Sequence, residues 1–387
     1  MTTTPPDAPV QSSEHHLESE VRPGDHRGSP IPTYAMIATR FMELRKRRGL
    51  MIALIFVFIG VPTIFLTIRL LAHAFDPHSY GPAGGYSIFG TLVVAILFGF
   101  GFIVAATLGC TAGAVDLTEG VFRHLVVTGR SRVALYLARI PAGLAIIVPL
   151  VAVGFTIVCS VCVFAAPAKL NYDGVSMPAG LSRSAFVSFA ESHPDQVYCD
   201  FSYRGPLSFG VPCGPNGHIT KIKTPPGVPA PTPPSKAQFQ TTVVKIADQN
   251  YTDYSKTFLT PPLSLMVEAG MWVELEAILG FVVGLGLASL MGQRTVPVVL
   301  MILLEVILTP LLTRVQIPHL INGQRGLLGL AMNRIEPSAL PAFSGAHGNG
   351  NGIALLSEST TVAVCVIVGW LVVWTALGAW RMATRDA

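Results

Sequence analysis

Residues 114–141, AVDLTEGVFRHLVVTGRSRVALYLARIP, form a polar segment between two long apolar runs. The run before it, 88–115, has no charged residue. The segment itself carries two acids and four arginines, which are Asp116, Glu119, Arg123, Arg130, Arg132 and Arg139. Because each flanking run is long enough to cross a bilayer as a helix, this pattern predicts two membrane spans joined by an ordered polar segment.

The composition of the whole chain indicates an integral membrane protein. Its 387 residues are 51% hydrophobic and only 12% charged, and the mean hydropathy is +0.55. Soluble proteins carry about 25% charged residues. The net charge of +4 is expected to reflect arginines on the cytoplasmic side of a membrane and not binding to nucleic acid.

Further apolar runs on both sides of the polar segment bring the number of candidate spans to six. They are 50–72, 88–115, 133–166, 263–291, 296–315 and 360–380. We therefore expect an all-α polytopic membrane protein with six transmembrane helices.

Lysines and arginines are unequally distributed between the two sides of these spans. They precede the first span, fill the 114–141 segment, separate the fourth span from the fifth and follow the sixth, whereas 73–87 has none. Short cytoplasmic loops carry an excess of basic residues, so both termini and the 114–141 segment are expected in the cytoplasm. The Gly-, Ala- and Pro-rich composition favours a bacterial protein, and the expected location is the bacterial plasma membrane.

The region before the first span divides into two parts. Residues 1–31 are rich in Pro, Ser and acids and lack the regions of a signal peptide, which predicts a disordered cytoplasmic tail. Residues 32–49 then place apolar side chains three or four residues apart, ahead of a basic cluster; these are Tyr34, Ile37, Phe41 and Leu44. This pattern predicts an amphipathic helix on the inner leaflet, and a plain basic stop signal is the alternative.

A long polar insert, 167–262, separates the third span from the fourth and is expected outside the cytoplasm. It holds Cys199 and Cys213, for which we predict a disulfide, with two free thiols as the alternative. Such a bridge would stabilise the fold by about 3 kcal/mol. A helix is expected before the fourth span, and the insert as a whole reads as either a small folded domain or a partly ordered cap.

Three glutamates lie within the predicted fourth and fifth spans, namely Glu274, Glu276 and Glu305. Charged groups at such depth are costly and tend to face a bundle interior or a wet cavity. They could line a polar translocation path or a proton-linked site, or they could bond to hydroxyls of neighbouring helices. In the same span Gly280, Gly284 and Ala288 form a stripe of small residues that allows close helix packing.

The order of these features resembles the ABC-2 type permeases, the membrane subunits of ATP-binding-cassette exporters. The stretch RFMELRKRRG, 40–49, resembles the elbow helix of the family, and 116–140 resembles its cytoplasmic coupling loop. The stretch LINGQRGLLGLAMNRIEPSALPAF, 320–343, resembles its short external helices, which dip back toward the membrane. The likeness covers most of 32–166 and 263–387, and the long insert departs from it.

The resemblance implies a division of the chain and a role for the opening segment. Elbow helix and spans 1–3 would occupy 32–166, the insert 167–262, and spans 4–6 263–387. The coupling helix would bury Phe122, Leu125 and Val126 in a partner ATPase, with turns at Gly120 and Gly129. Its charged contacts would come from Asp116, Glu119, Arg123, Arg130 and Arg132.

The implied activity is ATP-driven export of an unidentified substrate by two permease subunits, like or unlike, and two copies of a separate ATPase. The chain has no G-x-x-x-x-G-K-[ST] motif, so we expect no enzymatic activity and no cofactor of its own, with ATP and Mg on the partner. One alternative is a membrane-anchored sensor or scaffold whose insert binds an extracytoplasmic partner. Another is an intramembrane enzyme that uses the buried glutamates.

Overall fold

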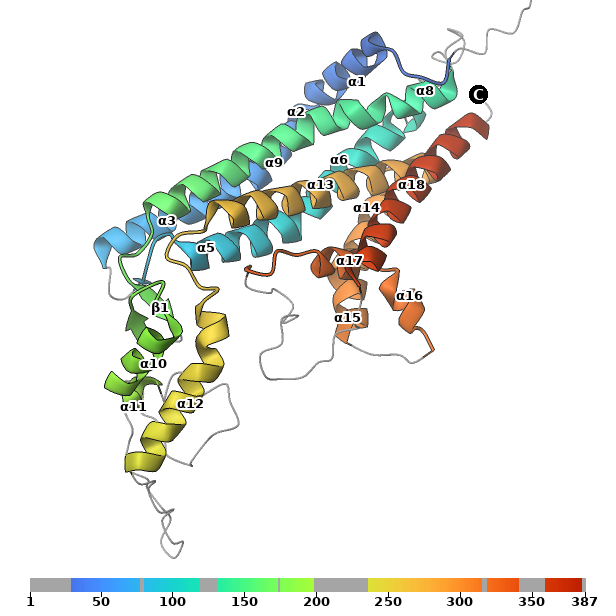
Figure 1. Cartoon of the computed structure of the whole chain (residues 1–387). Coiled ribbons are helices and arrows are strands. Elements are labelled where there is room, and N and C mark those ends of the chain that lie inside the picture. Colours follow the sequence, from blue (N-terminus) through green and yellow to red (C-terminus); the bar gives the residue numbers. More distant parts are fainter. Residues whose placement is uncertain are drawn as a thin grey trace, which may run out of the picture.

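The computed structural model describes residues 29–76, 80–118, 131–172, 175–197, 236–314, 319–340 and 359–384, and these are mostly helical (Figure 1). Five helices in this part of the chain are long and apolar enough to cross a membrane. They are Arg48–Phe75, Tyr86–Asp116, Arg132–Phe164, Leu263–Met291 and Thr360–Thr384. This agrees with a multi-pass membrane protein. The predicted fifth span begins as a shorter apolar helix, Thr295–Leu308.

Several of these helices are built from consecutive segments. A π-helical stretch occurs in two of the long helices and in the shorter one that begins at Thr295. Before the insert the order is α1 Tyr34–Lys46, α2 Arg48–Ile55, η1 Phe56–Gly60, α3 Val61–Phe75, α5 Tyr86–Thr91, η2 Leu92–Phe98, α6 Gly99–Thr118, α8 Arg132–Leu137 and α9 Arg139–Phe164. After the insert it is α13 Leu263–Met291, α14 Thr295–Ile302, η5 Leu303–Leu308, α15 Thr309–Arg314, α16 Ile321–Arg325, α17 Leu328–Arg334 and α18 Thr360–Thr384.

Helix α13 is the centre of the bundle and packs against α6, α9 and α18. Its small residues make the contact with α6 possible. A Cβ atom on Gly280 would lie 2.5 Å from the carbonyl oxygen of Phe102, and one on Gly284 would be equally close to that of Ala106. Ala288 is fully buried. The small-residue stripe predicted from the sequence is therefore confirmed as a packing surface.

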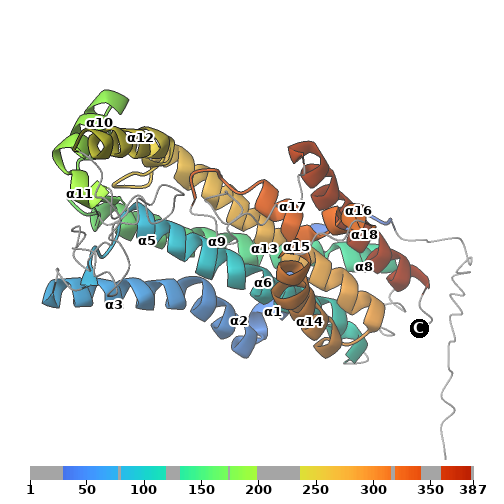
Figure 2. The same cartoon turned by 90° about the horizontal axis from the view of Figure 1, so that it is seen from below.

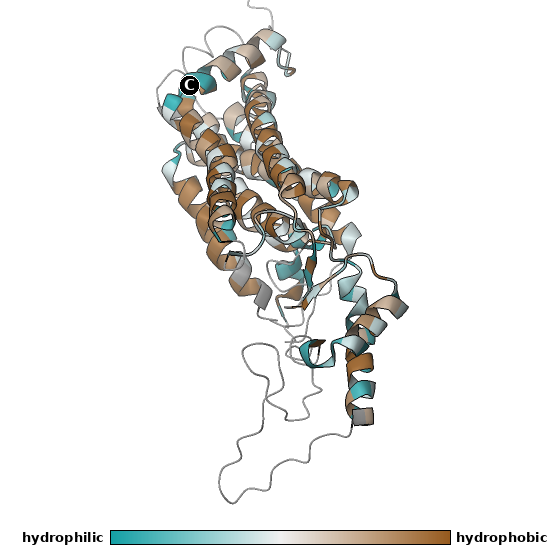
Figure 3. Cartoon of the chain, turned by 90° about the vertical axis from the view of Figure 1, so that its left-hand side faces the viewer, coloured by the Kyte–Doolittle hydropathy of each residue, from teal (hydrophilic) through white to brown (hydrophobic). Residues whose placement is uncertain are grey.

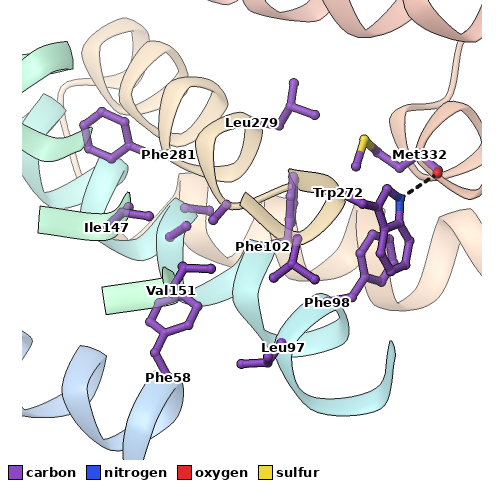
Figure 4. Close-up of a cluster of buried hydrophobic side chains, with 14 of the residues drawn as sticks. Phe58, Leu97, Phe98, Phe102, Ile147, Val151, Trp272, Leu279, Phe281 and Met332 are labelled. Atoms are coloured by element: carbon purple, nitrogen blue, oxygen red, sulfur yellow. Dashed lines mark hydrogen bonds between the residues drawn. The ribbon is translucent and has the colours of Figure 1, made fainter. Parts of the chain in front are cut away.

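Aromatic side chains fill the space between α13 and its neighbours (Figure 4). Trp272 stacks on Phe98 with ring centroids 4.0 Å apart, and its indole Nε1 donates to the carbonyl oxygen of Met332 over 3.0 Å. Met332 belongs to the short helix α17. The indole hydrogen bond therefore attaches α17 to the buried face of α13.

The two ends of the bundle differ. Figures 1 and 2 show α10, α11 and α12 at the end opposite the C-terminus, and Figure 1 shows α1 and α8 at the same end as the C-terminus. We call the end that carries α1 and α8 the α1 end. Figure 3 shows the bundle coloured mostly as hydrophobic, with a more mixed pattern on the projecting helices.

The described part of the insert forms a small unit with a core of its own. Its elements are β1 Leu170–Tyr172, β2 Val175–Met177, α10 Arg183–Ser192, α11 Pro194–Gln196 and α12 Lys236–Tyr254. The two strands pair antiparallel. Phe186 of α10 stacks on Tyr254 of α12 with ring centroids 4.3 Å apart, and both side chains are fully buried. The helix expected before the fourth span is therefore present.

Candidate functional site

A cluster of charged side chains joins three helices at the α1 end. Asp116, near the end of α6, accepts hydrogen bonds from Arg40 of α1 and from Arg139 at the start of α9. Arg40 donates to both carboxylate oxygens, over 2.7 and 2.6 Å. Arg139 donates to Oδ2 of Asp116 and, over 3.0 Å, to the carbonyl oxygen of Gly113. We call Arg40, Asp116 and Arg139 the arginine–aspartate cluster.

This cluster is buried, which determines its energetics. The side chains of Arg139 and Asp116 are only 2% and 3% exposed, and that of Arg40 is 11% exposed. Burial lowers the pKa of the Arg40 guanidinium, but the hydrogen bonds and charges of Asp116 and Glu43 outweigh that effect and raise it above its ordinary value. Breaking a buried ion pair leaves an uncompensated charge, so removing one partner is costly.

The cluster lies next to the predicted coupling loop. Asp116 and Arg139 lie near the two ends of the predicted coupling loop, 116–140, and Arg40 joins α1 to Asp116. The cluster therefore connects α1 to the end of α6 and the start of α9. The two guanidinium groups bound to one carboxylate hold α1, α6 and α9 in a fixed relative position, because planar charge-assisted hydrogen bonds fix orientation as well as distance.

Most residues of the predicted coupling helix lie outside the described residues. These are Glu119, Gly120, Phe122, Arg123, Leu125, Val126, Gly129 and Arg130. The two cysteines of the predicted disulfide, Cys199 and Cys213, also lie outside. Asp116 binds the two arginines inside the chain, and Arg132 begins α8, where it is half-buried.

A second polar site lies deeper in the bundle, between α13, η5 and α17. Glu276 of α13 is 2% exposed, and the charge of Glu305 in η5 acts on its carboxyl group. Glu305 is within hydrogen-bond reach of Thr309. Gly329 of α17 lies against this carboxyl, since a Cβ atom there would come within 2.7 Å of Oε1 of Glu305. We call Glu276 and Glu305 the glutamate pair.

Each carboxyl of the glutamate pair has an oxygen, Oε2, with no hydrogen-bond partner among the described residues. A buried polar atom left in this state is costly unless it holds a proton or a ligand. Glu274 lies two positions before Glu276, so it points to another side of α13. The structure therefore brings together two of the three predicted glutamates and separates the third.

Carboxyls on facing helices can hold a shared proton or a cationic group. The described part of the chain contains no cluster of three or more His, Cys, Asp or Glu side chains suited to a metal ion. Cys159 and Cys162 of α9 carry free thiols.

Sequence reasoning missed the two arginines of the cluster. The sequence showed Arg40 only as part of the predicted amphipathic helix and Arg139 only as one of four arginines in the 114–141 segment. A signal was present: Asp116 ends a long uncharged run, and an acid at the end of a span needs a basic partner. Glu336, which follows α17, was also missed. Its side chain is buried, Oε1 has no partner among the described residues, and burial raises its pKa to about 7.

Comparison with known proteins gives no match to any protein-family model, to any curated protein or to any solved structure.

Proposed function

We propose that this chain is the permease subunit of an ABC-2 type exporter. In this proposal α1 is the elbow helix on the inner leaflet, and the α1 end is cytoplasmic. The fifth of the six spans is supplied by α14, η5 and α15 together, which run without interruption from Thr295 to Arg314. Two permease subunits and a separate ATPase, which binds ATP and Mg, would export a substrate that the chain does not identify.

The observation that carries the proposal is the arginine–aspartate cluster. A permease without an ATPase of its own has to receive force from one. Force applied to the predicted coupling segment would reach α6 and α9, whose ends flank it, and the cluster fastens these two helices to α1. The three helices would then move as one unit when the partner ATPase closes.

The short helices before α18 support the same proposal. Helices α16 and α17 lie between α15 and α18 in the sequence, where the family resemblance implies short external helices. Five of the seven residues of α17 are buried, and the helix packs against α18. The glutamate pair beneath α17 would then lie on the translocation path, near its outer gate.

The test is a pull-down of the full chain from its native host in mild detergent, with ATPase activity measured in the eluate. The test variant changes Glu119, Phe122 and Arg123 to Ala. A matched control changes the same three residue types on α10, at the opposite end of the bundle: Arg183, Phe189 and Glu191. We expect a P-loop protein to accompany the parent and the control but not the test variant. Its absence from all three eluates would contradict the proposal.

The insert favours a second candidate, a sensor or scaffold that binds an extracytoplasmic partner, because it has its own aromatic core. Deleting 181–234 separates the two functions. Loss of an outer partner with retention of the ATPase would give the insert a separate binding role. Loss of both would indicate that the insert is needed for the fold.

A further inference from the structure

A cleft at the α1 end is independent of both polar sites described above. It has a volume of about 460 Å³ and lies between the start of the first span, the second half of α6 and the start of α14. Arg47 and Arg48 line it from the first span, Thr111 from α6, and Arg294 from the turn before α14. Three separate elements thus contribute to one concave surface.

The cleft has a strong positive charge. Arg48 and Arg294 are exposed, and neither forms an ion pair with an acid in the described part of the chain. Glu43, an acid on the neighbouring helix, is already bound to Arg40. Guanidinium groups are well suited to phosphate, because their planar donors match its oxygens and they are weakly hydrated.

The rest of the cleft is lined by apolar side chains and by threonines. Leu50 and Val298 line the cleft, and Val299, which is 59% exposed, lies next to them on α14. Thr107 and Thr111 also line it, and each hydroxyl donates to the backbone carbonyl four residues earlier, over 2.8 Å. Their oxygens therefore remain able to accept a hydrogen bond from a ligand hydroxyl.

We propose that this cleft binds the headgroup of an anionic glycerophospholipid. The phosphate would lie between Arg48 and Arg294, headgroup hydroxyls would donate to the threonine oxygens, and an acyl chain would run along Leu50 and Val299. Basic pockets between spans at the cytoplasmic side are a recognised setting for such headgroups. A soluble anion would use the arginines but would leave the apolar wall without a role.

Native mass spectrometry of the detergent-purified full chain tests the proposal, with phosphatidylglycerol and phosphatidylcholine titrated separately. The test variant is Arg48→Gln with Arg294→Gln. The matched control is Arg45→Gln with Arg381→Gln, which removes the same charge at the same end of the bundle outside the cleft. We expect the test variant to bind phosphatidylglycerol roughly thirtyfold more weakly and the control to bind it as the parent does.

Three outcomes would overturn the proposal. An equal loss in test variant and control would assign the binding to general surface charge. Equal binding of both lipids to the parent would remove the role of the anionic headgroup. Displacement of phosphatidylglycerol by inorganic phosphate at similar concentration would make the cleft a site for a free anion. None of these results bears on the exporter proposal, because the ATPase pull-down tests a different surface.

Discussion

The arginine–aspartate cluster and the glutamate pair both bury ionisable groups, but they differ in how completely those groups are satisfied. Asp116 receives hydrogen bonds on both oxygens from two arginines. The charge of Glu305 acts on Glu276, and each carboxyl retains an oxygen without a partner among the described residues. In the first region both carboxylate oxygens are satisfied within the chain, and Nε of Arg139 is the buried atom that lacks a partner among the described residues. The second is complete only when a proton or a ligand is added.

This difference suggests a structural role for the arginine–aspartate cluster and a functional role for the glutamate pair. A satisfied buried network fixes helices relative to one another, whereas an unsatisfied one stores a cost that the fold tolerates for another reason. The contrast makes opposite predictions for stability when an acid is removed from each region. Removing Asp116 leaves buried arginines without their partner, whereas removing one carboxyl of the glutamate pair removes a buried acid that is not fully hydrogen-bonded.

The largest effect is expected at the cluster. Asp116→Ala would leave Arg139 charged, buried and without its acid, which costs about 3–5 kcal/mol. Thermal unfolding in detergent, followed by intrinsic fluorescence, would show a large fall in Tm or failure to recover folded protein. Glu43→Ala removes an acid whose side chain is 32% exposed and serves as the control, with a small effect. A normal Tm for Asp116→Ala would show that the cluster does not fasten the helices.

Glu336 resembles the glutamate pair, because its carboxyl is also buried with one oxygen lacking a partner among the described residues. It predicts that the stability of the protein depends on pH. Burial raises its pKa from 4.5 to about 7, so the folded state binds a proton that the unfolded state releases. Its contribution to stability is therefore fully present below pH 4.5 and is lost as the pH rises through 7, by up to about 3 kcal/mol. The Tm of Glu336→Gln should equal that of the parent at pH 4.5 and exceed it at pH 8. A constant Tm difference across this range would contradict the burial argument.

At the glutamate pair the change should go in the opposite direction to that at the cluster. Glu276→Gln replaces a buried carboxyl by a neutral amide of nearly the same shape, so we expect an unchanged or higher Tm, corresponding to about 1 kcal/mol. Export should fall if the pair lies on the substrate path. Glu268→Gln, on the exposed side of α13, is the control. A loss of stability comparable to that of Asp116→Ala would mean that Glu276 has a structural partner.

Much of the fold could be predicted because hydrophobicity alone determines where spans lie. The stripe of Gly280, Gly284 and Ala288 predicted close packing, and α13 meets α6 along it. On the predicted apolar face of α1, Leu44 is buried and Tyr34 is 85% exposed, while Met36, which the prediction left out, is buried against α8. That the face lies on the inner leaflet stays a prediction. Helical periodicity identifies a face, but only the neighbouring helix decides which part of that face is covered.

The candidate site could be predicted only in part, because pairing between distant residues is not encoded locally. The sequence marked Glu276 and Glu305 as unusual but could not show that the charge of Glu305 acts on Glu276. It likewise marked Asp116 without its arginines, since Arg40 lies 76 positions away. Charge at an unexpected depth is readable from sequence, whereas the partner that neutralises it depends on the tertiary arrangement.

The smallest effect on the Tm is expected at an exposed ion pair. Arg183 of α10 forms two hydrogen bonds with Asp248 of α12, over 2.6 and 2.8 Å, and these bonds raise the pKa of the guanidinium and lower that of the carboxyl. The geometry is as good as at the cluster, but the side chains are 62% and 48% exposed. Water replaces the lost partner at such a site, so Arg183→Gln should leave the Tm unchanged within error. A fall as large as that of Asp116→Ala would show that hydrogen-bond geometry, and not burial, sets the strength of these pairs.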